Sequence, residues 1–227
     1  MPTLIEWNQF YLPNVPLYDI KLPDFIVSRL WDYVKKSEKK MNYALAGNIA
    51  ESLELIDEDD YFFNMILKPM SVKYISENTN IRQFQSNHTT ESELYLSKLW
   101  VNYQYKHEFN PMHSHLGVIS FVIWMKIPTK AKDQHNLPIA KNSNSPSASD
   151  FSFAYTDILG GIHDYKIQQS PSDNGTMIIF PAGLNHQVYP FYECDEKRIS
   201  ISGNLNFMFQ YEKQEFPQQG IAFEPTK

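Results

Sequence analysis

The stretch NPMHSHLGVISFVIWMKI, residues 110–127, joins a polar turn and two closely spaced histidines to an apolar run. The apolar part, residues 118–127, is rich in β-branched and aromatic side chains, and its length indicates a buried strand rather than a membrane span. His113 and His115 therefore lie just before a strand of the core. Because side chains at positions i and i+2 of an extended segment point to the same side, we expect both imidazoles to face one point.

The rest of the chain predicts a mainly β fold with N-terminal helices. Two amphipathic helices are expected in the first third, one from Asp24 to a lysine-rich end at residues 35–40 and one over residues 59–77. Further short strands, separated by turn residues, are typical of a sandwich or jelly roll. They are expected at residues 94–105, 151–155, 176–180, 187–191 and 198–207.

We expect one domain over residues 1–227, because a chain of this length can bury one sizeable core. Within it, residues 1–90 form a mostly helical support, residues 91–210 form the β core that carries the site, and residues 211–227 form a C-terminal tail. Residues 129–149 lack an apolar rhythm, which indicates an exposed loop, either a mobile lid or a plain connector.

A third histidine, His186, follows the strand at residues 176–180 and the turn Pro181-Ala182-Gly183. Both histidine groups then lie at strand ends, where the mouth of a barrel brings distant segments together. Three imidazoles would occupy one face of a metal ion and leave the other face open for ligands. Arg198, on the following strand, suits the carboxylate of an organic acid bound to such a metal.

Composition narrows the class of protein and of partner. The net charge of −6 and the pI near 5.6 disfavour general binding to nucleic acid or to an anionic membrane surface. A single cysteine, Cys194, allows no internal disulfide and no cysteine-rich zinc site. With no secretory leader recognised, we expect a cytoplasmic protein, or one in the host cytoplasm if a phage encodes it. An aromatic-rich edge strand would suit a homodimer.

Four quoted stretches together resemble a known superfamily. They are WVNY at residues 100–103, NPMHSHLG at residues 110–117, GTMIIFPAGLNHQVYP at residues 175–190 and RISISGN at residues 198–204. Their combination is similar to the 2-oxoglutarate- and Fe(II)-dependent oxygenases, and more narrowly to a branch found in bacteria and in phages of cyanobacteria. The resemblance covers about half of the chain, roughly residues 95–208.

The resemblance implies a double-stranded β-helix with Fe(II) at its open end and 2-oxoglutarate as co-substrate. It implies His113 and His186 as metal ligands, with His115 in the place of the family's usual carboxylate. It assigns Arg198 and Ser200 to the far carboxylate of 2-oxoglutarate. Three further residues are candidates for contacts with the co-substrate, namely Tyr103, Asn102 and Asn204.

The histidine at position 115 is the departure from the family pattern. Three neutral imidazoles leave the iron its full double charge, whereas a carboxylate would lower that charge by one. Glu108 is the nearest acid upstream, but its odd spacing from His113 places it on the other face of a regular strand. Whether His115 or an acid completes the site stays open at this point.

The resemblance implies a hydroxylase that couples decarboxylation of 2-oxoglutarate to oxidation of a second substrate. That substrate is a small molecule or a peptidyl residue, a prolyl residue among the alternatives, and the sequence carries no code for it. Two other functions remain open: a three-histidine, cupin-like dioxygenase that needs no 2-oxoglutarate, and a non-catalytic jelly roll that binds a metal. Arg198 separates the first of these, since it would have no partner there unless the substrate were itself an acid.

Overall fold

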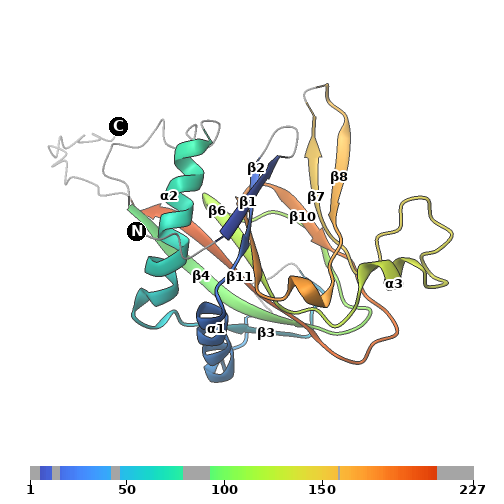
Figure 1. Ribbon diagram of the computed structural model, residues 1–227, viewed down its shortest axis with the longest axis horizontal. Helices are drawn as coiled ribbons and strands as arrows, with labels where there is room; N and C mark the ends of the chain where they lie inside the picture. Colours follow the sequence, from blue (N-terminus) through green and yellow to red (C-terminus); the bar gives the residue numbers. More distant parts are fainter. Residues whose placement is uncertain (1–5, 12–15, 42–46, 79–92, 158, 209–227) are drawn as a thin grey trace, which may run out of the picture.

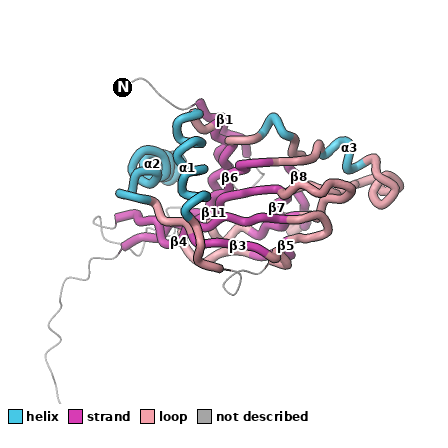
Figure 2. Tube along the Cα trace, turned by 90° about the horizontal axis from the view of Figure 1, so that it is seen from below, coloured by secondary structure: helices cyan, strands magenta, loops and turns pink. Residues whose placement is uncertain are grey.

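The computed structural model describes residues 6–11, 16–41, 47–78, 93–157 and 159–208 (Figure 1). Within them, two antiparallel sheets of seven and four strands form a double-stranded β-helix. Helices α1 (Asp24–Lys36) and α2 (Lys68–Glu77) lie together on one side of the strands, and the short helix α3 (Ala131–His135) lies at the other end of the molecule (Figure 2). The protein is thus a mainly β fold with N-terminal helices, as predicted.

The sheets interleave strands that are distant in sequence. The larger sheet has the order β1 (Glu6–Tyr11), β2 (Pro16–Lys21), β9 (Thr176–Pro181), β6 (Ile119–Lys126), β11 (Arg198–Met208), β4 (Glu93–Gln104) and β3 (Glu51–Glu54). The smaller sheet has the order β5 (Asn110–His113), β10 (Asn185–Val188), β7 (Phe151–Thr156) and β8 (Ile162–Ile167). The chain therefore crosses between the sheets several times, which brings the ends of β5, β10 and β11 into one region.

Helix α1 forms where its sequence predicts. It begins directly after Pro23, buries Ile26, Leu30 and Val34 along one face, and ends in lysines that suit the negative end of the helix dipole. The second helical stretch begins with the 3-10 turn η2 (Glu58–Asp60) and continues as the π-helix η3 (Phe63–Leu67) into α2. Pro69 lies at the start of α2, directly after η3.

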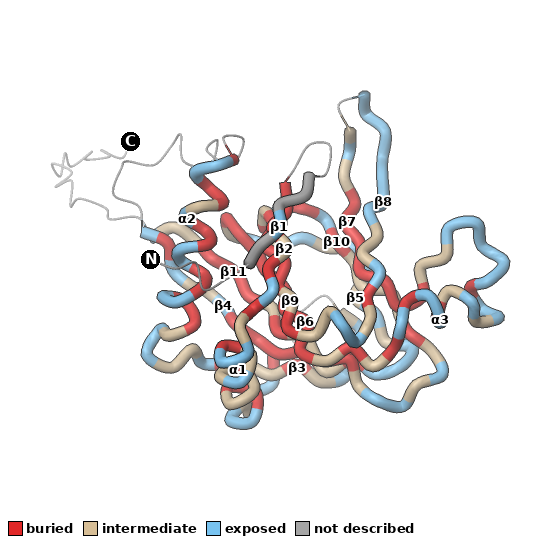
Figure 3. Tube along the Cα trace, in the orientation of Figure 1, coloured by how far each residue is buried: buried red, intermediate tan, exposed pale blue. Residues whose placement is uncertain are grey.

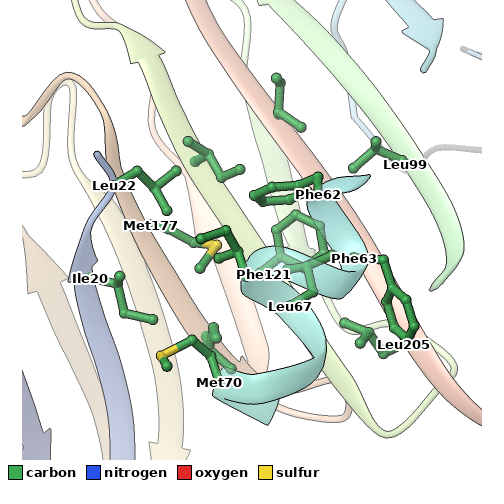
Figure 4. Close-up of a cluster of buried hydrophobic side chains, with 14 of the residues drawn as sticks. Ile20, Leu22, Phe62, Phe63, Leu67, Met70, Leu99, Phe121, Met177 and Leu205 are labelled. Carbon is green, nitrogen blue, oxygen red and sulfur yellow. The ribbon is translucent and has the colours of Figure 1, made fainter. Parts of the chain in front are cut away.

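Alternation along the strands of the larger sheet divides the core into two layers. On β6, Phe121 and Ile123 face the helices, whereas Val122 and Trp124 face the smaller sheet. Figure 4 shows the helix-side layer, in which Phe62, Phe63, Leu67 and Met70 pack against strand residues such as Phe121. Buried residues run through the central strands of both sheets (Figure 3). The inner face of the larger sheet is therefore free to form the wall of a site.

Five expected strands are confirmed as β4, β6, β7, β9 and β11, and the expected strand at residues 187–191 begins earlier, as β10. The region predicted as a mostly helical support, residues 1–90, carries α1 and α2 and also three strands that were not expected, β1, β2 and β3, which join the larger sheet. The weak alternation of these short segments hid them, and their pairing with β9 and β4 stabilises them. The predicted tail at residues 211–227 lies outside the described residues.

None of the helices in the described part of the chain has the length and apolar character needed to cross a membrane. Short helices such as α1 instead present one apolar face to the sheet.

Candidate metal centre

The three predicted histidines converge. His113 at the end of β5 is the register partner of His186 on β10, and their ring centroids lie 4.3 Å apart. The ring of His115 lies 5.0 Å from each of the other two rings. One ring nitrogen from each of the three histidines lies within 4.8 Å of the other two. Among the described residues, these three side chains form the candidate metal-binding group. Nitrogen donors this close together could hold one metal ion between them.

A bulge between β5 and β10 helps to aim the first histidine. The register passes from His186 opposite His113 to Val188 opposite Asn110, so β5 has one more residue than β10 over this interval. Pro111 and Met112 lie in the interval, and proline suits such a place because it has no N–H for the ladder. As a result, both Asn110 and His113 line the same cavity despite their odd spacing.

Backbone carbonyls select the ring nitrogens that face the ion. The Nδ1–H of His113 donates to the Pro111 carbonyl at 2.7 Å, and the Nδ1–H of His186 donates to the Leu184 carbonyl at 2.9 Å. Because a carbonyl only accepts, each neutral ring carries its proton on Nδ1 and leaves Nε2 free to bind a metal. Histidine ligands of protein metal sites are commonly held in this way.

The electrostatic environment keeps the imidazoles of His186 and His115 neutral. Burial lowers the pKa of His186 to about 3, and burial followed by the proximity of His113 lowers the pKa of His115 to about 4. Phe151 stacks on the His186 ring and the edge of Phe180 contacts it, so an apolar wall surrounds this ligand. Neutral imidazoles are the form that binds divalent transition metals, and this donor set fits Fe(II).

The histidines line a cavity of about 170 Å³. Described residues from both sheets line it, among them Trp124 and Phe180, and no Asp or Glu is among them. Glu108 lies elsewhere: its carboxylate accepts hydrogen bonds from the backbone N–H groups of Ala50 and Tyr105. His115 is therefore the third nitrogen donor of the candidate group, with no acid beside it among the described lining residues.

Arg198 lines the same cavity and is the one lining residue in the described part of the chain that carries a full charge. Its side chain is only 2% exposed, and burial lowers the pKa of its guanidinium to about 10, so it stays charged at neutral pH. Nη2 donates to the carbonyl and hydroxyl oxygens of Ser149, and Nη1 donates to Oε1 of Gln104. Nε is buried and has no hydrogen-bond partner. An orphaned cationic donor beside a metal site fits the carboxylate of a metal-bound acid.

The other candidate residues divide between the two faces of their strands. Ser200 and Asn102 line the cavity, and the Asn102 amide also accepts a hydrogen bond from Ser52 at 2.7 Å. The structure does not bring Tyr103 to the cavity, because its side chain packs against the helix-side core and the Lys197 amine lies 5.0 Å from its ring. Asn204 points inward but lies away from the cavity, where its amide accepts a hydrogen bond from Ser120.

Two residues beside Arg198 were not predicted. Gln104 shares the cavity face of β4 with Asn102, so strand alternation could have identified it. Ser149 comes from the end of the segment predicted to be exposed, yet its side chain is fully buried. No sequence signal pointed to Ser149, because its contact with Arg198 spans 49 positions of the chain.

A family model described as "Putative 2OG-Fe(II) oxygenase" matches residues 98–204. No curated protein matches the chain. Similar solved structures include a Pseudomonas putida prolyl-4-hydroxylase, with 14% identity over 88% of this chain and 91% of that one and a TM-score of 0.44. A Trichoplax adhaerens prolyl hydroxylase in complex with a hypoxia inducible factor oxygen degradation domain peptide fragment has 11% identity, covers 86% and 84%, and has a TM-score of 0.46. A 2OG-Fe(II) oxygenase family oxidoreductase from Burkholderia pseudomallei has 12% identity, covers 89% and 73%, and has a TM-score of 0.38.

Proposed function

We propose that this chain, whose residues 98–204 match a family model for a 2OG-Fe(II) oxygenase, hydroxylates an uncharged group of its substrate, such as a prolyl or other peptidyl residue. Its cofactors are Fe(II) and 2-oxoglutarate. The overall reaction consumes the substrate, O₂ and 2-oxoglutarate and yields the hydroxylated substrate, succinate and CO₂. The observation that carries the proposal is the presence of three convergent imidazoles and one buried guanidinium in the same cavity.

In this proposal His113, His115 and His186 hold the iron through one ring nitrogen each. When bound, Fe(II) supplies the redox chemistry by which O₂ is activated at the expense of 2-oxoglutarate. The carbonyls of Pro111 and Leu184 hold two of the rings in the tautomer that a metal requires. Because the protein would supply three ligands, the ion would keep further coordination positions for the co-substrate.

Arg198 binds the far carboxylate of 2-oxoglutarate, with Ser200 beside it on the same face of β11. The orphaned Nε supports this role, since a buried cationic donor without a partner is costly unless a ligand completes it. The same feature favours 2-oxoglutarate over the cupin-like alternative, in which no carboxylate would reach this donor unless the substrate were itself an acid.

The lining also supports the substrate class. Once the Arg198 charge is paired by 2-oxoglutarate, the described lining residues hold neutral imidazoles, amides, hydroxyls and aromatic rings. A charged reacting group would then be buried without a counter-charge, which is expensive. Trp124, Phe151 and Phe180 provide an apolar wall that excludes water from the reacting group.

Two variants and two matched controls test the proposal. We expect His186→Ala to lose Fe(II) binding, and Arg198→Met to keep Fe(II) while losing 2-oxoglutarate. His163→Ala, on the exposed strand β8, and Arg29→Met, on the outer surface of α1, should bind both as the parent does. Calorimetric titration under nitrogen measures the binding, and iron-dependent succinate release in air measures turnover. Retention of 2-oxoglutarate binding by both His186→Ala and Arg198→Met would refute the assignment, and tight zinc with no succinate release would favour an inert metal site.

A further inference from the structure

The donors of Arg198 are already largely occupied by the protein itself. Nη2 lies 2.6 Å from the carbonyl oxygen of Ser149 and 2.5 Å from its hydroxyl oxygen. Nη1 lies 3.3 Å from Oε1 of Gln104, and Nε has no partner. Because Nη2 carries two hydrogens, the two oxygens of Ser149 use its full donor capacity.

This occupation matters because of the shape of the guanidinium. A carboxylate binds the planar fork with two parallel hydrogen bonds, through either Nη1 and Nη2 or Nε and Nη2. The third pair, Nε and Nη1, is blocked by the side chain's own Cδ. Each available pair includes Nη2. A carboxylate can therefore form two parallel hydrogen bonds with the guanidinium only if Ser149 gives up at least one of its contacts with Nη2.

Ser149 holds its place in an unfavourable backbone conformation. Its φ is +71°, in the left-handed region that favours glycine, and its side chain is fully buried. Besides Arg198, its hydroxyl contacts the hydroxyl of Thr129 at 2.9 Å, and its N–H donates to the carbonyl of Pro190. The bonds to Arg198 help to offset the backbone cost, so their loss would favour release of Ser149.

We propose that Ser149 competes with the carboxylate of 2-oxoglutarate for Nη2 of Arg198, so that co-substrate binding displaces Ser149 and loosens the segment that it ends. The inference rests on the proposed function, in which Arg198 binds that carboxylate. An ionised carboxylate forms stronger hydrogen bonds to a guanidinium than a neutral carbonyl or hydroxyl does, so it wins the exchange. Ser149 then lowers the affinity for 2-oxoglutarate and couples its binding to the conformation of residues 136–149.

Helix α3, which precedes residues 136–149, is held by contacts of its own, so the displacement of Ser149 should not move it. The side-chain amide of Gln134 exchanges two hydrogen bonds with the backbone of Tyr192. The ring of His135 contacts both carboxylate oxygens of the buried Asp150, at 2.9 and 3.0 Å. These contacts do not involve Arg198, so α3 stays in place when Ser149 moves. The Lys166 amine donates to the carbonyls of Ser145 and Pro146, so the change must also loosen this contact in order to spread along the segment. Lys141 lies beyond this contact and is exposed, so trypsin cleavage there reports that the change has spread.

Calorimetric titration of the Fe(II)-loaded protein with 2-oxoglutarate under nitrogen tests the competition. We expect Ser149→Ala, which removes one acceptor from Nη2, to lower the Kd for 2-oxoglutarate about three- to tenfold. Ser149→Gly should lower it less, because glycine adopts a φ of +71° without strain and so stabilises the remaining carbonyl contact. The glycine variant also keeps the test decisive if the alanine variant folds poorly. Ser147→Ala is the matched control and should leave the Kd unchanged, because the Ser147 hydroxyl contacts Ser145 and Tyr189 and not Arg198.

Trypsin cleavage at Lys141 provides a second readout that a purely structural role would not produce. In the parent protein, 2-oxoglutarate should speed this cleavage, whereas Ser149→Ala should be cleaved rapidly without it. An unchanged or raised Kd in Ser149→Ala, or cleavage that does not respond to 2-oxoglutarate, overturns the competition. Binding of Fe(II) but not of 2-oxoglutarate by the parent and every variant overturns the proposed function of Arg198, and this inference with it.

Discussion

Gly203 on β11 lies where a single added methyl group should be costly. It pairs with Leu99 of β4 on one side and with Phe121 of β6 on the other. A Cβ at this position would lie 2.5 Å from Cζ of Phe121 and 2.7 Å from the backbone carbonyl of Lys98. Both distances are shorter than carbon atoms tolerate, so a neighbour must move.

Neither neighbour can move cheaply. Phe121 is 1% exposed and its ring lies edge-on to Phe62 at 6.0 Å, so its withdrawal would disturb the contact between helix and sheet. The Lys98 carbonyl belongs to the backbone of β4. Overpacking of this kind costs about 1–3 kcal/mol, while the loss of chain entropy in the unfolded state returns about 0.4–1 kcal/mol. Because both contacts would be shorter than 3.0 Å, the cost should lie at the upper end of this range, and we expect Gly203→Ala to lower the free energy of unfolding by about 2 kcal/mol.

Urea unfolding followed by tryptophan fluorescence measures this change. With an m-value of about 2 kcal/mol/M, the midpoint should fall by about 1 M. Gly183→Ala is the matched control, since nothing lies within 4 Å of a Cβ there, and it should change the free energy by less than about 0.5 kcal/mol. Equal midpoints for the two variants would show that close packing at β11 does not limit stability, and the reasoning would fail.

Three further predictions concern the site. Tyr103→Phe should leave the Kd for 2-oxoglutarate unchanged, because Tyr103 does not contact Arg198. Gln104→Ala should raise the Kd, because Gln104 positions the guanidinium through one hydrogen of Nη1 and leaves the second hydrogen for the carboxylate; calorimetry distinguishes the two variants. In metal-free protein, the pKa of His186 is about 3 and that of His115 about 4, against 6.5 in the unfolded chain. The unfolded chain therefore binds more protons below pH 6.5, so the free energy of unfolding in EDTA should fall as the pH drops from 6.5 towards 4. His115→Asp should retain Fe(II), because a carboxylate is an equally suitable ligand that also lowers the charge of the site, whereas His115→Ala should bind it more weakly.

Each of these has a clear contrary result. A raised Kd in Tyr103→Phe would mean that the outer face of β4 contributes to the site. A free energy of unfolding that stays flat or rises between pH 6.5 and pH 4 would mean that the buried rings do not titrate as neutral groups. Equal metal affinity in His115→Asp and His115→Ala would mean that position 115 does not bind the ion.

The strands that carry the site were predictable where apolar runs are long. The apolar patterns of β6, β9 and β11 predict these strands without knowledge of their partner strands, and the residue types before His113 likewise predict a turn. The short strands β1, β2 and β3 were missed, because each acquires its conformation from a partner strand that is far away in the sequence.

The candidate side chains show the same division. Asn102 and Tyr103 are adjacent on a regular strand, so they could not both face the cavity, and the register of β4 decided for Asn102. Asn204 follows Ser200 on the correct face but lies beyond the cavity, opposite Ser120. Alternation along a strand can therefore be read from sequence, whereas position along the strand relative to the cavity cannot.

The sequence by itself determined the mainly β class, the helix α1, and the residue types that bring together neutral nitrogen donors and one fixed cation. Only the tertiary structure decided that the rings of His113, His115 and His186 meet, that no acid joins them among the described lining residues, and that Ser149 occupies the fork of Arg198. The physical reason is range. Side-chain periodicity and ligand chemistry are local properties of the chain, whereas the convergence of β5, β10 and β11 depends on strand pairing between segments many residues apart.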